Sequence, residues 1–181
     1  MHPVLKHSLD PLADAIEVLT LEEAQVKPPP GQDQWSAQQV IEHLILTYKL
    51  TTATVGKHLK SGRAARKGRG PLLSLLRLQT MGFGRMPRGI PAMHAVRPDR
   101  VTPMDGHALQ ERFLAAAEEM DEQLVAARKK FGIQPCGEHP FYGGLRVDEW
   151  RRYHAVHALH HRKQLEGAIR FARSGKAAGA D

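Results

Sequence analysis

The chain has 181 residues, enough for one domain that buries a sizeable core without disulfide bonds. Hydrophobic residues make up 41% and charged residues 25%, as in ordinary globular proteins, and the single cysteine excludes an internal disulfide. No basic and apolar leader opens the chain, and no apolar run reaches the roughly 18 residues that a membrane span needs, so we expect a cytoplasmic protein without membrane contact.

The first elements predicted in chain order are two amphipathic helices. Apolar residues recur at spacings of three and four over residues 3–21, which indicates a helix of roughly five turns. A proline run at 28–30 separates this helix from a second one at 36–60. Ser36 fits the N-cap of the second helix, with Gln39 three residues later in the reciprocal capping position.

A long connection follows at residues 61–104, which are rich in Gly, Pro and Arg. Its one predicted regular element is a short helix over 71–78. A connection of this length in a compact domain is usually a lid, a crossover or a mobile segment. It would also allow the long helices on either side of it to lie parallel.

Much of the net charge of +7 is concentrated at residues 57–69, with six cations and no acid. Such a segment can bind nucleic acid electrostatically. It has no aromatic residue for base stacking, and its Gly and Ser favour a solvated loop. Both interpretations of this basic segment stay open, with the loop preferred.

Two further helices are predicted at 105–130 and 148–173. Asp105 fits the N-cap of the first. With four long helices and no convincing strand, we predict an all-α four-helix bundle over residues 1–173 as a single domain. The small and polar residues 174–181 are expected to form a flexible tail.

Four of the eleven histidines lie within one predicted helix, at 154, 157, 160 and 161. At about 100° per residue, His157 and His161 are neighbours one turn apart on the apolar face. His43 points inward from the helix at 36–60 by the same criterion. Three buried imidazoles with an open coordination position suit zinc or a related divalent metal, which would lower the pKa of a bound water. The alternative is that these are hydrogen-bonded core histidines.

Other side chains could serve this site in lesser roles. His154 could be a fourth ligand, a substrate contact, a proton shuttle or only a residue at the edge of the bundle, whereas His160 fits packing or the surface. Gln164 lies one turn from His161 and could hydrogen-bond it from behind the metal. Glu42 is a weak candidate for a general base. Cys136 is a weak candidate for a thiol nucleophile.

Three segments resemble motifs of the DinB/YfiT-like superfamily. Residues 35–44 are similar to the tryptophan-to-histidine opening of its second helix, and 157–165 to its last-helix motif of two histidines followed by Arg-x-Gln. Residues 138–150 are similar to an uncharacterised bacterial branch. Lys163 stands where Gly is common in the motif. The resemblance implies a four-helix bundle, often a homodimer, with a metal bound by three residues: His43, His157 and His161.

Two functions of different classes are expected from these patterns. The first is a metal-dependent enzyme, a hydrolase or a transferase that uses a low-molecular-weight thiol, with zinc or nickel at the three histidines and an unknown small-molecule substrate. The second is a non-catalytic, stress-related bundle protein that binds a metal or nucleic acid. A bundle that keeps its histidines for packing alone is a third and weaker hypothesis. The sequence identifies no catalytic residue.

Overall fold

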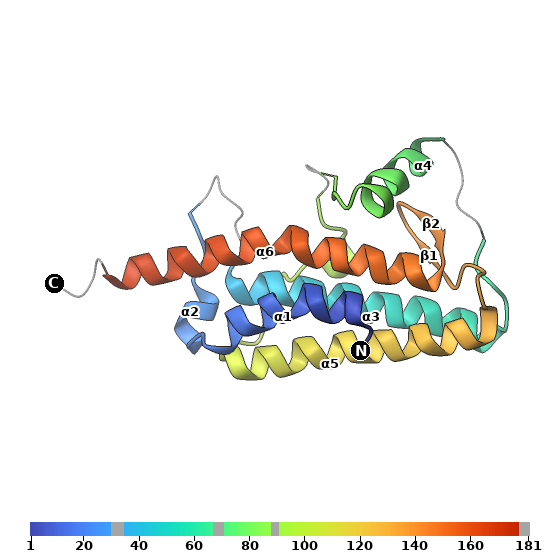
Figure 1. Cartoon of the computed structure of the whole chain (residues 1–181). Helices are drawn as coiled ribbons and strands as arrows, with labels where there is room; N and C mark the ends of the chain where they lie inside the picture. Colours follow the sequence, from blue (N-terminus) through green and yellow to red (C-terminus); the bar gives the residue numbers. More distant parts are fainter. Residues whose placement is uncertain (30–34, 67–70, 88–90, 178–181) are drawn as a thin grey trace.

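The structure is a computed structural model that describes residues 1–29, 35–66, 71–87 and 91–177. Four long helices lie along one another (Figure 1): α1 (Pro3–Glu17), α3 (Ala37–Ser61), α5 (Gly106–Phe131) and α6 (Val147–Ala177). The all-α prediction is therefore confirmed, with a two-stranded sheet as a small addition. Residues 30–34 of the proline connector, 67–69 of the basic segment and 178–181 of the tail lie outside the described residues.

The helices α3 and α5 run parallel, as the long connection between them allows (Figure 1). Near their starts, Arg112 Nη1 donates a hydrogen bond to Glu42 Oε1 at 2.7 Å. Near their ends, Lys130 Nζ donates to Leu59 O at 2.7 Å. The helices α1 and α6 run in the opposite direction to this pair (Figure 1), and all four helices contribute side chains to one hydrophobic core.

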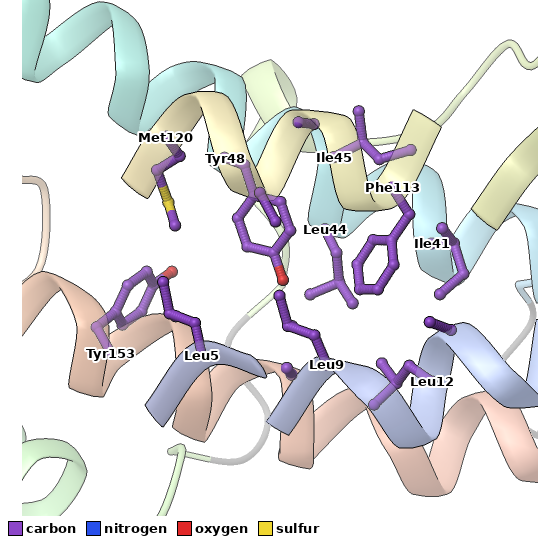
Figure 2. Close-up of a cluster of buried hydrophobic side chains, with 14 of the residues drawn as sticks. Leu5, Leu9, Leu12, Ile41, Leu44, Ile45, Tyr48, Phe113, Met120 and Tyr153 are labelled. Carbon is purple, nitrogen blue, oxygen red and sulfur yellow. The ribbon is translucent and has the colours of Figure 1, made fainter. Parts of the chain in front are cut away.

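The core forms where the apolar faces of these helices meet (Figure 2). Leucines of α1 interdigitate with aliphatic and aromatic side chains of α3, α5 and α6, and nearly all are fully buried. Each such side chain stabilises the fold by roughly 1.5–3 kcal/mol through burial. The labelled members of this core are Leu5, Leu9, Leu12, Ile41, Leu44, Ile45, Tyr48, Phe113, Met120 and Tyr153.

The helix starts follow the predicted capping residues. Ser36 Oγ accepts from the Gln39 N–H at 3.2 Å, and the Gln39 side chain accepts from the Ser36 N–H at 3.2 Å, which completes a capping box. Asp105 Oδ1 accepts from the Ala108 N–H at 2.9 Å. The positions of α3 and α5 along the bundle are therefore determined locally by polar residues at their first turns.

Two predicted helix ends are wrong. The first helix ends at Glu17 rather than at residue 21, because a second capping box at Thr20 begins a separate short helix, α2 (Leu21–Gln25). In the turn between them, Leu19 O accepts from the Gly106 N–H, and a Cβ at Gly106 would lie 1.9 Å from Ile16 O. At the other end of the chain, α6 extends to Ala177, so residues 174–177 are helical.

The long connection contains the predicted short helix, α4 (Pro71–Arg77), which continues into a π-helical turn, η1 (Leu78–Gly82). A 3-10 turn, η2 (His94–Val96), packs against α3. The connection thus places backbone from its second half beside the middle of the bundle.

The antiparallel hairpin of β1 (Gly137–His139) and β2 (Gly143–Leu145) was not predicted. Its strands have three residues each and contain three glycines in total, so they lack the alternating apolar pattern of a strand. Gly143 has a φ of 68°, and a Cβ at Gly144 would lie 1.9 Å from Arg66 O. The hairpin therefore depends on close backbone packing rather than on side-chain pattern.

Candidate metal centre

The three predicted ligands, His43, His157 and His161, come together in the interior between α3 and α6. Each is buried, and one ring nitrogen from each lies within 4.8 Å of the other two. The Nε2 atoms of His43 and His161 lie 3.2 Å and 3.0 Å from His157 Nε2. The structure thus brings together the set that helical phase predicts.

The hydrogen bonds behind the rings determine where the protons lie. His43 Nδ1 donates to Val96 O at 2.7 Å, and a carbonyl can only accept. His161 Nδ1 donates to Gln164 Oε1 at 2.8 Å. In the neutral rings the Nε2 atoms of His43 and His161 therefore carry no proton. Each has a lone pair, and both atoms lie close to His157 Nε2.

This arrangement has more acceptors than donors. His157 carries one ring proton when neutral, so its Nε2 can satisfy at most one of the two lone pairs. A cation at the centre would satisfy all three nitrogens at once, and neutral imidazole nitrogens are common ligands of zinc and related metals. The donor set therefore fits a transition metal ion.

Burial favours the neutral form that a metal needs. It lowers the pKa of His161 to about 3 and the pKa of His157 well below its usual value, with the neighbouring histidines adding to the effect. The pKa of His43 is lowered as well, again mainly by burial. All three imidazoles are thus available as ligands at neutral pH.

The cluster lies in the wall of a pocket of about 910 Å³. Trp35 also lines the pocket, with its ring centroid 5.0 Å from that of His43 and stacked at 6.2 Å on that of His161. The rest of the wall comes from the connection, the hairpin and α6. A small molecule in this pocket would therefore reach the three histidines.

His154 lies outside the cluster, although it is fully buried on the same helix. Its Nε2 lies 3.1 Å from Thr51 Oγ1, and its ring packs against Tyr48 and Trp150. It is not among the residues that line the pocket. The structure therefore does not support the roles of fourth ligand, substrate contact or residue at the bundle edge.

The other predicted side chains divide between the site and the scaffold. Gln164 makes the expected hydrogen bond to His161, and His160 is exposed at the pocket wall. Glu42 forms an ion pair with Arg112 instead of facing the pocket. Burial raises the pKa of the Cys136 thiol to about 11, which leaves it protonated and a poor nucleophile.

Sequence reasoning missed two contributors, Val96 and His139. Val96 supplies the carbonyl that orients His43 from a 3-10 turn in the connection. His139 lies in β1, is buried and lines the pocket. Neither lies at helical spacing from His43, His157 or His161, so no periodic signal in the sequence could have identified them.

Comparison with known proteins gives one match. No curated protein and no solved structure matches the chain. A family model described as "Protein of unknown function (DUF1569)" matches residues 6–168. None of the helices within the described ranges has an apolar stretch that could cross a membrane.

The family match corrects the resemblance to the DinB/YfiT-like superfamily, because the model that matches the chain is that of DUF1569. That resemblance depended on short motifs around the histidines. A histidine pair one turn apart suits a metal site in any helical family, so it does not identify one family. Because the family model matches most of the length of the chain, the chain belongs to the DUF1569 family.

Proposed function

We propose that His43, His157 and His161 bind one divalent transition metal, and that the protein is a metal-dependent enzyme acting on a small molecule in the adjoining pocket. One observation carries this proposal: two buried lone pairs are directed at the third imidazole, in the wall of a pocket. Hydrolysis is the reaction that this arrangement supports best.

We further infer that α1, α3, α5 and α6 form a four-helix bundle with the metal in its interior. Ligands on two facing helices are held by the whole core, and helix-borne sites are more rigid than loop-borne ones. His43 and His161 are each oriented by a hydrogen bond from behind, to Val96 O and Gln164 Oε1. Such support keeps the rings in position with or without the ion.

Zinc or nickel is the proposed metal, because nitrogen ligands without carboxylate or thiolate suit these ions. A bound metal with an open coordination position would polarise a substrate oxygen and lower the pKa of a water molecule. Beside it, the ring of Trp35 packs against the rings of His43 and His161. A thiol-dependent transferase would use the same open position, but the resemblance that suggested the thiol has been overturned.

The alternative hypothesis of a non-catalytic, stress-related protein that binds a metal or nucleic acid shares the same three histidines. No contact within the described ranges favours it over the enzyme. The homodimer and the cytoplasmic location stay predictions from the sequence. The metal site is the part on which the two hypotheses agree, so it is tested first.

The test is the metal content of the full chain. The wild type, loaded with zinc or nickel and then desalted, is expected to retain about one ion per chain by inductively coupled plasma mass spectrometry. His157→Ala should retain none, because it removes the imidazole that the other two approach. Helical content by circular dichroism shows whether the variant stays folded.

The matched control is His154→Ala. This residue is buried on the same helix one turn earlier, so its removal also leaves a cavity, but it is not a ligand. It should retain the ion as the wild type does. A wild-type chain that retains neither metal after loading would overturn the proposal.

A further inference from the structure

His139 is a second histidine environment within the same pocket. It belongs to the hairpin, whereas the three candidate ligands belong to α3 and α6. Its side chain is buried and lines the pocket. Its ring stacks on Tyr142 with centroids 4.5 Å apart and meets Tyr153 edge-on at 4.6 Å. Tyr153 in turn stacks on His157 at 5.4 Å. One tyrosine ring therefore separates His139 from the proposed metal site.

The hairpin determines the tautomer of His139. Its Nδ1 accepts a hydrogen bond from the Phe141 N–H at 3.1 Å, and a backbone N–H can only donate. The proton of the neutral ring is therefore on Nε2. Burial lowers the pKa of His139 to about 3, so the ring stays neutral in ordinary buffers.

The Nε2–H has no acceptor within the described parts of the chain. The ring's only hydrogen bond within those parts is the one that Nδ1 accepts from Phe141. Because the ring lines the pocket and its Nδ1 edge faces the hairpin turn, Nε2 is the polar edge left for the pocket. The Nε2–H of His139 is therefore a donor held in place, without an acceptor among the residues that the structure describes.

The rest of the wall indicates what kind of molecule would meet this donor. The described lining residues are mainly apolar or aromatic, with no carboxylate among them, and include Met86, Met93, Phe141, Tyr142 and Tyr153. Lys163 is exposed at the wall and adds positive charge. Such a pocket disfavours a positively charged substrate and suits a compact molecule with an apolar body and an acceptor oxygen.

We propose that His139 is a substrate-binding residue whose Nε2–H donates a hydrogen bond to an oxygen of a small carbonyl compound, an ester, amide or carboxylate with an apolar or aromatic body. This deepens the proposed function and rests on it, because the same molecule would also reach the three histidines. The two proposals can still fail separately, since one concerns the metal and the other concerns a donor in the hairpin.

The experiment uses 4-carboxybenzohydroxamate as the probe, because its hydroxamate binds transition metals while its carboxylate, on the opposite end of the aromatic ring, offers oxygens to the His139 donor. It is titrated calorimetrically into the zinc-loaded full chain. His139→Asn can keep an acceptor near the Nδ1 position for Phe141 but loses the donor to the pocket, whereas His139→Gln can place an N–H near the Nε2 position. The expected result is binding about 3- to 10-fold weaker for His139→Asn, as for one lost hydrogen bond, and within about 2-fold of wild type for His139→Gln.

Equal binding by wild type and His139→Asn would overturn the proposal, and so would an equal loss in both variants, because the donor would then not be what matters. Zinc content measured in the same samples shows separately whether the metal site fails. Long-range nitrogen–proton spectra of the histidines provide a readout that needs no metal. A proton on Nδ1 of His139 would overturn the proposal, and in metal-free protein so would His139 ring signals that do not shift when 4-carboxybenzohydroxamate is added.

Discussion

His157 and His154 are buried one turn apart on α6, yet they lie in environments of different chemistry. His157 faces two imidazole lone pairs that it cannot satisfy together. The Nε2 of His154 faces one hydroxyl, that of Thr51. This hydroxyl can donate to the ring nitrogen or accept from it, so either tautomer of His154 is satisfied at Nε2. Burial alone therefore does not distinguish a candidate ligand from a core residue. The distinguishing feature is that two acceptor nitrogens lie close to the same atom of His157.

The largest expected effect is on stability with and without the metal. Zinc in 1,000-fold excess over its dissociation constant stabilises a folded site by about 4 kcal/mol, which for a domain of this size raises the melting temperature by on the order of 10 °C. Differential scanning calorimetry should show this rise for wild type and for His154→Ala. His161→Ala should show none. A rise of equal size in His161→Ala would remove the contrast between the two environments.

A smaller effect is expected from the hydrogen bond behind His161. Gln164→Leu keeps the size of the side chain but removes the acceptor from His161 Nδ1. Loss of such a partner weakens metal binding by about 10- to 100-fold, because the ring is no longer held in the right tautomer and orientation. Competition with a chromogenic chelator measures the affinity. An unchanged affinity would show that packing alone orients the ring.

The last effect concerns pH and the metal-free protein, and it is measured as a slope rather than as a single shift. Burial lowers the pKa of His154 to about 3, whereas an unfolded histidine titrates near 6.5, so between these values the unfolded chain binds more protons. The stability that the neutral His154 contributes is therefore present above about pH 6.5 and is lost as the pH falls toward 3. His154→Gln should reduce the slope of unfolding free energy against pH by about 1.4 kcal/mol per pH unit in that window.

Urea unfolding at several pH values measures that slope. The control is Leu159→Gln, because Leu159 is an exposed residue of the same helix and its replacement leaves every titratable group in place. Its slope should equal that of the wild type. Equal slopes for His154→Gln and Leu159→Gln would show that His154 is not held neutral by burial.

The ligands of α3 and α6 were predictable because helical phase depends only on spacing along the chain. His157 and His161 share a face by arithmetic, and the apolar neighbours of His43 show that it points inward. Phase also placed His154 near the same cavity, about 60° from His157. The structure instead packs it against Tyr48 and Trp150, because neighbouring helices determine which part of an inward face opens to a pocket.

The remaining parts of the site depend on contacts between segments far apart in the sequence. Val96 contributes a carbonyl, which every residue has, so its identity carries no signal. His139 depends on a hairpin held by Gly143 and Gly144, where glycines and short strands conceal the usual alternation. The family, likewise, could not be inferred from short motifs, since a histidine pair at helical spacing suits a metal site in many helical families.

The separation of the ligands along the chain has a consequence for the order of events in synthesis. His43 and His157 lie 114 positions apart, so the first ligand leaves the ribosome long before the other two. A nascent chain offers the metal one imidazole from α3, which is too few to hold an ion. The proposed ion could therefore be captured only after α6 has docked, and it would then join α3 to α6. Loading would in this way report that these two helices have folded together.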